Sequence, residues 1–145
     1  MLSPIQTRRH WFRRIHLESN DEFQGGECQY ETNISLTLKK NETLWNVRLR
    51  VALKSKSGER LGNYIIDVES EGSFEIHPDF PDEKAEDLVR MNGGAILYGM
   101  IREAVLSNTA RSQHGPFEIP TIDARMFIKR PNPNNKPAEQ EKSAS

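Results

Sequence analysis

The spacing between apolar residues changes once along this chain, and this change constrains the fold more than any other feature of the sequence. Between residues 45 and 53 every second side chain is apolar, and the positions between them are mostly polar. A period of two is typical of a strand with one buried face. The apolar positions of this strand are Trp45, Val47, Leu49, Val51 and Leu53.

The same alternation predicts three more strands, at residues 5–18, 30–39 and 61–70. Polar connections typical of hairpins separate the second strand from the third and the third from the fourth, and Gly72 predicts a bend after the fourth. In the first strand, a strict period of two puts these residues on the core face: Ile5, Trp11, Ile15 and Leu17. It divides the arginines of this strand between the two faces, Arg8 and Arg14 on one and Arg9 and Arg13 on the other.

Beyond the breaker at residues 77–81 the apolar spacing becomes helical. Acidic residues at positions 82–87 are typical of a first helical turn, and the helical pattern continues to about Leu106. Pro120 suits the start of a short final helix that runs through Ile128. The sequence therefore predicts an α+β fold: a four-stranded antiparallel sheet followed by a long helix and a short C-terminal helix, both packed on one face.

Length and composition indicate one domain without covalent or metal cross-links. A chain of 145 residues with a formal net charge of −1 is large enough for a hydrophobic core, and its bulk charge does not indicate a nucleic-acid or membrane partner. We predict one domain over residues 1–130 and a disordered tail over residues 131–145, which has no apolar periodicity. A single cysteine, no signal-peptide pattern and no apolar run long enough to span a bilayer predict a cytoplasmic protein.

No catalytic or metal-binding pattern emerges from the sequence. Cys28 lies beside glycines with no basic neighbour to activate a thiol, so we interpret it as a bystander. The histidines are scattered without metal-ligand spacing. Gly93 and Gly94 fall inside the helical pattern, whereas a phosphate-binding loop lies between a strand and a helix. We therefore expect no enzyme, no metal and no cofactor.

The long helix is apolar nearly all round between residues 95 and 106. A helix packed on a single sheet should have one apolar stripe, so the second side is expected to contact another subunit. The residues predicted at this oligomer interface are Ala95, Tyr98, Met100, Ile101 and Val105.

A second group of apolar residues lies outside the regular core. Phe117 and Ile119 fall in the loop after the long helix, and Ile122, Met126 and Phe127 follow in the final helix. Methionine and aromatic side chains suit an adaptable apolar groove. The alternative is that these side chains only hold the last helix against the sheet.

Several segments resemble the SecB-like protein-export chaperones. They are residues 2–6 and 15–20, residues 67–74 (DVESEGSF), and residues 92–127, where an Arg-Glu pair, a Gly-Pro-Phe turn and IPTIDARMF follow in order. The resemblance implies a homotetramer, a dimer of dimers, that captures unfolded polypeptides without ATP. It implies a client-binding groove formed by the crossover-loop residues and the sheet wall: Phe117, Ile119, Ile122, Met126, Phe127, Trp45 and Tyr30.

The resemblance also implies an outer sheet face that docks the SecA translocation motor, with Glu18, Ile65 and Asp67 at the matching positions. This chain departs from the family where Arg14 replaces an expected acid, which opposes motor docking. We predict a SecB-like chaperone for protein transport that binds unfolded clients. The alternatives are a chaperone dedicated to one client such as an antitoxin, a scaffolding oligomer, and a nucleic-acid-binding regulator that uses Arg8, Arg14, Arg48 and Arg50.

Overall fold

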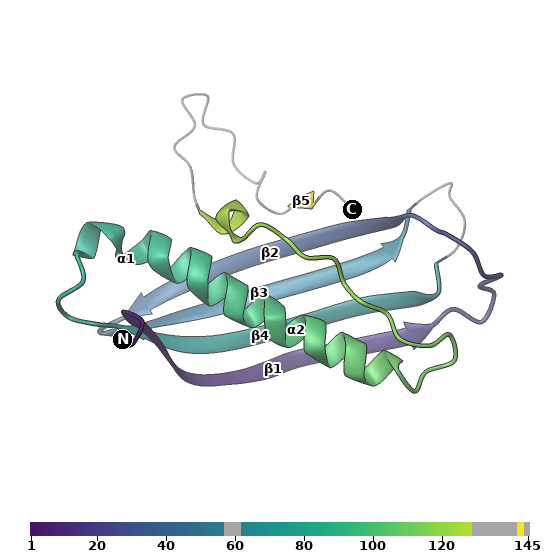
Figure 1. Cartoon of the computed structure of the whole chain (residues 1–145), viewed down its shortest axis with the longest axis horizontal. Helices are drawn as coiled ribbons and strands as arrows, with labels where there is room; N and C mark the ends of the chain where they lie inside the picture. The colour runs from purple at the N-terminus through teal and green to yellow at the C-terminus, as the bar shows by residue number, and fades with distance from the viewer. Residues whose placement is uncertain (57–61, 129–141, 144–145) are drawn as a thin grey trace, which may run out of the picture.

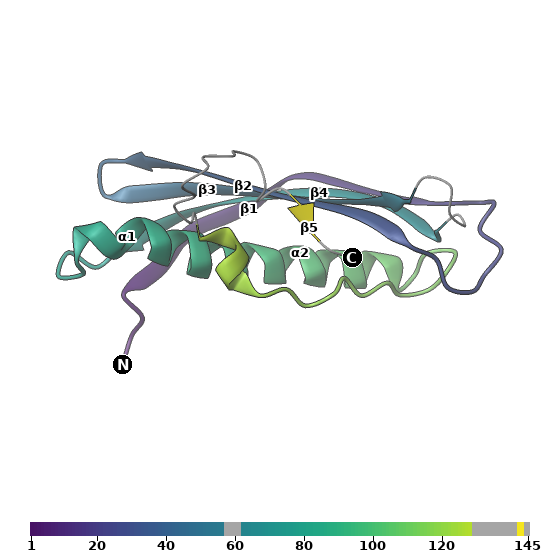
Figure 2. The ribbon, with the colours of Figure 1, turned by 90° about the horizontal axis from the view of Figure 1, so that it is seen from above.

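A computed structural model describes residues 1–56, 62–128 and 142–143 of the chain. These residues form two layers, an antiparallel sheet and a helical layer that covers one of its faces (Figures 1 and 2). The face under the helices is called the inner face below, and the opposite face the outer face. The α+β fold predicted from the sequence is confirmed.

The sheet is built from long strands in the order β1-β4-β3-β2-β5. Their bounds are β1 Ile5–Ser19, β2 Tyr30–Asn41, β3 Leu44–Ser55, β4 Tyr64–Ile76 and β5 Lys142–Ser143. All pairings are antiparallel, and β5 pairs with Thr32 and Asn33 at the edge of β2. The rest of the predicted tail, residues 131–141 and 144–145, lies outside the described residues.

The alternation of apolar and polar residues gives β3 one buried face, as the sequence predicts. Its odd-numbered side chains face the helices, and Val47, Leu49 and Val51 are fully buried there. The register places them beside even-numbered residues of β4, such as Val68. Burying each such side chain stabilises the fold by about 1.5–3 kcal/mol.

Gly72 lies within β4, which continues to Ile76 without the predicted bend. A side chain at Gly72 would approach Leu97 of the helix to 3.2 Å, so the glycine allows close packing.

Strand β1 departs from the predicted alternation at two bulges. Its register against β4 shifts between Thr7 and Arg9 and again between Phe12 and Arg14. Each bulge adds one residue and reverses the faces of the residues that follow. Trp11 is therefore opposite Glu71 on the outer face, contrary to the prediction, whereas Phe12 takes the inner position.

The helical layer is one long helix interrupted by a single π-helical segment. It consists of α1 (Asp82–Leu88), η1 (Val89–Gly93) and α2 (Gly94–Thr109). The π-helical turns start at Val89, where the backbone remains right-handed. The predicted final helix is shorter than expected: only η2, Ala124–Phe127, is helical, and Asp123 caps it by accepting a hydrogen bond from the backbone nitrogen of Arg125.

Candidate functional site

The segment between α2 and η2, residues 110–123, is called the crossover loop here. It turns back beside α2 on the inner face, toward the β2 side of the sheet (Figure 1). Side chains of α2 fix its backbone: the Tyr98 hydroxyl donates to the Pro120 carbonyl oxygen at 2.6 Å, and Arg102 Nε donates to the Ile119 carbonyl oxygen at 2.9 Å. At the end of α2, the buried Thr109 hydroxyl oxygen accepts a hydrogen bond from the Phe117 backbone nitrogen at 2.8 Å.

An aromatic cluster lies where the crossover loop meets the sheet. The Phe117 ring packs edge-on against Tyr30 of β2 and Tyr64 of β4, with ring centroids 5.3 and 6.2 Å apart. The Tyr64 hydroxyl donates to the Gly115 carbonyl oxygen at 2.6 Å and accepts from the His114 backbone nitrogen at 3.1 Å. The loop is thus held at one end of the sheet by an apolar contact and hydrogen bonds together.

The Tyr30 hydroxyl is integrated into this cluster. It accepts a hydrogen bond from the Asn63 backbone nitrogen at 2.9 Å and donates to the Asn63 side-chain oxygen. Burial, followed by a hydrogen bond with Cys28, raises the pKa of Tyr30 to about 12. The phenol is therefore neutral at physiological pH, and the ring offers a half-buried apolar face beside Phe117.

The structure divides the predicted groove residues into two groups. Ile119, Phe127 and Trp45 are buried in the chain itself, with exposed fractions of 0%, 4% and 8%. The half-buried group, which packs against the core and keeps some exposed surface, is Tyr30, Phe117, Ile122 and Met126.

Trp45 is also distant from the aromatic cluster. It is opposite Lys40 at one end of the β2–β3 pair, whereas Tyr30 is opposite Ser55 at the other end. Ten residues of strand separate Trp45 from Ser55, which corresponds to roughly 33 Å. The structure therefore does not bring Trp45 together with Phe117 and Tyr30.

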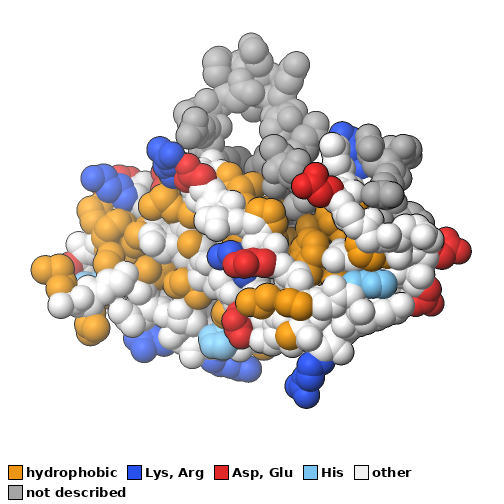
Figure 3. Space-filling model, turned by 45° about the vertical axis from the view of Figure 1, so that its right-hand side comes forward, with side chains coloured by type: hydrophobic (Ala, Val, Ile, Leu, Met, Phe, Trp, Pro, Cys, Tyr) orange, Lys and Arg blue, Asp and Glu red, His pale blue; other side chains and the backbone are white. Residues whose placement is uncertain are grey.

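Two leucines of β2 belong with the half-buried group, although the sequence did not single them out as site residues. Leu36 and Leu38 share the inner face of β2 with Tyr30 and are only partly covered. Their alternation with polar residues was the available signal. In the view of Figure 3, apolar side chains are grouped in patches on the face turned to the viewer. We name the set Tyr30, Leu36, Leu38, Phe117, Ile122 and Met126 the β2-side apolar surface.

The residues predicted at the oligomer interface also fall into different environments. Tyr98, Ile101 and Val105 are buried within the chain, Met100 is half-buried and Ala95 is exposed. The crossover loop covers the second apolar side of α2, which explains why that helix is apolar beyond one stripe. The exposed side of α2 carries Ala95, Ile96 and Gly99, and no described atom would lie within 4 Å of a side chain at Gly99.

The three residues predicted to dock the motor do lie together on the outer face. Glu18 and Ile65 are direct cross-strand partners, and Asp67 follows on the same face of β4. The Asp67 carboxylate accepts two hydrogen bonds from Arg50, at 3.0 and 2.8 Å, and lies 3.5 Å from an Arg14 nitrogen. The hydrogen bonds from Arg50 lower the pKa of Asp67, so this acid is already paired within the chain.

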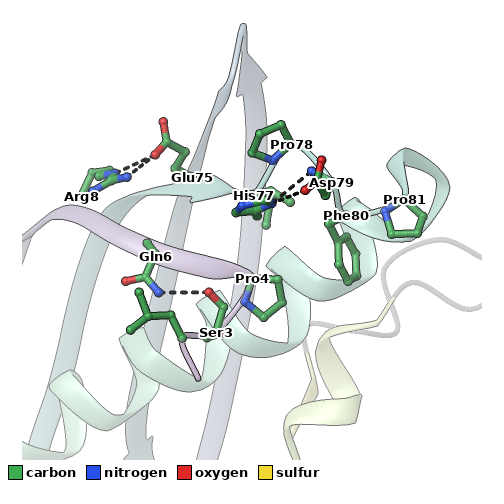
Figure 4. A pocket seen from close by; sticks show the side chains of 12 residues that line it. Ser3, Pro4, Gln6, Arg8, Glu75, His77, Pro78, Asp79, Phe80 and Pro81 are labelled. Carbon is green, nitrogen blue, oxygen red and sulfur yellow. Dashed lines mark hydrogen bonds and ion pairs between the residues drawn. The ribbon is translucent and has the colours of Figure 1, made fainter.

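A separate open cavity of about 720 Å³ lies at the start of β1 (Figure 4). Its apolar lining comes from Leu2, Pro4, Ile76 and Phe80 among others, and an Arg8–Glu75 ion pair lies at its rim.

Within residues 1–56, 62–128 and 142–143, no group of three or more histidine, cysteine or acidic side chains is placed to hold a metal ion. No helix in the described part of the chain is long and apolar enough to cross a membrane.

The family model described as preprotein translocase subunit SecB matches residues 12–132. This chain belongs to the SecB family. The resemblance that the sequence suggested is thereby confirmed, and the match includes all of β2, β3, β4, the long helix, the crossover loop and η2. The SecB family consists of chaperones, which agrees with the predicted class of function.

Two solved structures match this chain. One is the Mycobacterium tuberculosis Rv1957 SecB-like chaperone in complex with a ChAD peptide from the Rv1956 HigA1 antitoxin, at 19% identity and a TM-score of 0.62, covering 82% of this chain and 91% of that one. The other is a protein of unknown function from Streptococcus agalactiae, at 11% identity and a TM-score of 0.45, covering 81% and 97%. The search of curated proteins returned no match.

Proposed function

We propose that this chain is an ATP-independent holdase that binds unfolded polypeptides on the β2-side apolar surface. Membership in the SecB family supports the chaperone function. The observation that carries the site is the half-buried group around Phe117, whose backbone is fixed by Thr109 and α2 while its ring remains partly exposed. A fixed backbone with partly exposed apolar side chains binds apolar segments with little loss of conformational entropy on the chaperone's side.

In this proposal the buried members of the predicted groove have a supporting function. Ile119 and Phe127 hold the crossover loop and η2 against α2, and Trp45 belongs to the inner-face core. Client contact then comes from the members of the β2-side apolar surface: Tyr30, Leu36, Leu38, Phe117, Ile122 and Met126. The chaperone domain covers residues 1–130 and works in the cytoplasm without a cofactor.

We further propose that the chaperone is a homo-oligomer, a dimer of dimers. The exposed side of α2, with Ile96 at 38% exposure beside Ala95 and Gly99, supports a contact with a second helix. The free edge of β1, which has no strand partner on its outer side within the described residues, supports pairing with a second copy.

The client is either a range of exported proteins or one dedicated partner. Ion pairing of Asp67 with Arg50 and Arg14 argues against docking of the SecA motor on the outer face, because those arginines would have to release the carboxylate. The similar Rv1957 chaperone is bound to an antitoxin peptide, which favours a dedicated client as the second candidate.

An aggregation assay tests the holdase and its site together. A denatured protein is diluted into buffer with the wild type, with a Leu36→Ser/Met126→Ser variant, or with Leu2→Ser, an apolar-to-polar control just before β1, the edge strand on the other side of the sheet from β2. We expect the wild type and the control to suppress light scattering and the double variant to lose most of this activity. Circular dichroism and multi-angle light scattering of the free proteins check folding and assembly.

Lack of suppression by the wild type at several-fold molar excess would refute a general holdase and leave the dedicated-client form. Equal suppression by the wild type and the double variant would refute the β2-side apolar surface as the client site. Loss of suppression in Leu2→Ser instead would move the site to the cavity at the start of β1.

A further inference from the structure

The two bulges of β1 bring all four of its arginines to the outer face. Arg9 and Arg14 are opposite the outer-face residues Ser73 and Glu69 of β4. The bulge residues Arg8 and Arg13 also reach that face, because Arg8 pairs with Glu75 and Arg13 pairs with Glu69 and Glu71. A strict alternation would have divided these four arginines between the two faces.

Strand β3 adds two arginines on the other side of β4. Arg48 lies 3.6 Å from Glu71, and Arg50 binds both carboxylate oxygens of Asp67. The acidic row of β4 therefore lies between two rows of arginines. We name this set the arginine face: Arg8, Arg9, Arg13, Arg14, Arg48 and Arg50, with Trp11.

The arginines lie above the carboxylates. The side chains of Arg8, Arg13, Arg14, Arg48 and Arg50 are 42–55% exposed, whereas those of Asp67, Glu69 and Glu71 are only 13–24% exposed. A guanidinium group has five N–H donors, and Arg50 uses only Nε and one terminal nitrogen on Asp67. The carboxylates thus fix the guanidinium groups while other donors face solvent.

Trp11 gives this face an aromatic contact. It is half-buried on the outer side of β1, and the Arg9 guanidinium lies 5.1 Å above its ring. Tryptophan and arginine together are typical of the residues that dominate protein–protein binding energy. A solvated sheet face needs no tryptophan.

We propose that the arginine face is a docking surface for an acidic polypeptide segment. Side-chain carboxylates of such a partner match the planar donor edge of arginine in bidentate geometry, and Trp11 accepts an apolar side chain between them. The fixed guanidinium groups lower the entropy that binding costs. This surface lies on the opposite side of the sheet from the β2-side apolar surface, so it serves a second partner or a second part of the client.

Charge placement favours an acidic polypeptide over a nucleic acid. Nucleic acids bind most strongly to surfaces with a strong uncompensated positive potential. Here the carboxylates of β4 lie within 4 Å of the arginines, well inside the screening length of about 8 Å, and weaken the field at long range. Binding then depends on arginine N–H groups that contact the ligand directly. A few spaced carboxylates on a peptide can accept hydrogen bonds from these groups.

The test measures binding of a fluorescein-labelled peptide of alternating glutamate and serine by fluorescence anisotropy at low ionic strength. We compare the wild type with Arg48→Gln/Arg50→Gln and with Lys84→Gln/Arg111→Gln, which removes the same charge from exposed positions in α1 and at the start of the crossover loop. A lysine–serine peptide and an oligothymidylate of the same charge number are the competing probes.

We expect the acidic peptide to bind the wild type and the Lys84/Arg111 control alike and the Arg48/Arg50 variant roughly tenfold more weakly. We also expect Trp11→Phe to weaken binding while the fold is retained by circular dichroism. Equal weakening in both double variants, preference for the oligothymidylate, or no binding would overturn the proposal. A change in assembly size in Arg48→Gln/Arg50→Gln would assign the face to a second copy of the chain. Aggregation suppression should be unchanged in these variants, which separates this surface from the client site.

Discussion

The contact between Gly94 and Phe127 gives the most direct test of how η2 is held. Phe127 is 4% exposed, and a side chain at Gly94 would lie 2.5 Å from its Cδ2 atom and 2.8 Å from Cε2. Ordinary carbon contacts are at 3.4–4 Å. Gly94→Ala therefore forces the Phe127 ring out of its position.

The expected change in the free energy of unfolding of Gly94→Ala is the sum of two opposite effects. Replacing glycine by alanine inside a helix stabilises by about 1 kcal/mol. Displacing the Phe127 ring costs up to about 1.5–3 kcal/mol of burial. We expect Gly94→Ala to lower the free energy of unfolding by about 0.5–2 kcal/mol. Gly99→Ala is the comparison in the same helix, since no described atom of the chain would lie within 4 Å of its new methyl group. It should raise the free energy of unfolding by about 1 kcal/mol. Because Gly99 also lies on the side of α2 proposed to contact a second copy, light scattering must show that this variant assembles as the wild type does.

Urea denaturation followed by circular dichroism, at one fixed protein concentration, measures both variants. The decisive comparison is Gly94→Ala in a Phe127→Ala background, where the clash is gone. There the substitution should stabilise like a normal glycine-to-alanine change, so the double-mutant cycle should show a coupling of about 1.5–3 kcal/mol. Additive effects, or equal stabilisation by Gly94→Ala and Gly99→Ala in the wild type, would refute the packing of Phe127 on Gly94.

Two further predictions concern the crossover loop and the aromatic cluster. Thr109→Val removes the hydroxyl oxygen that accepts the hydrogen bond of the Phe117 backbone N–H, so it should lower the free energy of unfolding by about 1–3 kcal/mol. It should also speed hydrogen exchange at the Phe117 amide, and unchanged exchange there would contradict this hydrogen bond. The pKa of Tyr30, raised to about 12, should appear as a tyrosine ionisation near pH 12 in an ultraviolet titration, and this step should disappear in Tyr30→Phe. Because the folded pKa is above the unfolded value of 10.0, the stability from the neutral phenol is fully present below pH 10 and is lost as the pH rises through about 12.

The sequence predicted the elements of the fold because one face of each is buried. In β3 the core side chains follow a strict period of two, and the structure places all of them inward. The sequence predicts the long helix from an acidic first turn at residues 82–87 to about Leu106, and the helix spans 82–109 with the π-helical segment included. The π-helical segment was not predictable, because its residues follow no distinct apolar spacing.

The candidate site was predicted in composition but not in detail. Phe117, Met126 and Tyr30 are half-buried, whereas Ile119 in the crossover loop and Phe127 in η2 are buried. Sequence patterns do not distinguish an apolar side chain that packs inside a loop from one that lines its surface. Only the hydrogen bonds from Tyr98 and Arg102, which fix the loop against α2, decide which residues remain accessible.

The sequence by itself determined the strands and the long helix, because apolar periodicity and turn residues are local properties, and the resemblance of several segments to SecB-like chaperones indicated the family. The tertiary structure alone decided which face the β1 arginines occupy. A bulge depends on pairing with β4, and each bulge reverses the faces of the residues beyond it. The same local sequence that indicated a divided set of arginines therefore forms one continuous arginine face, since strand register is fixed by long-range packing and not by period two alone.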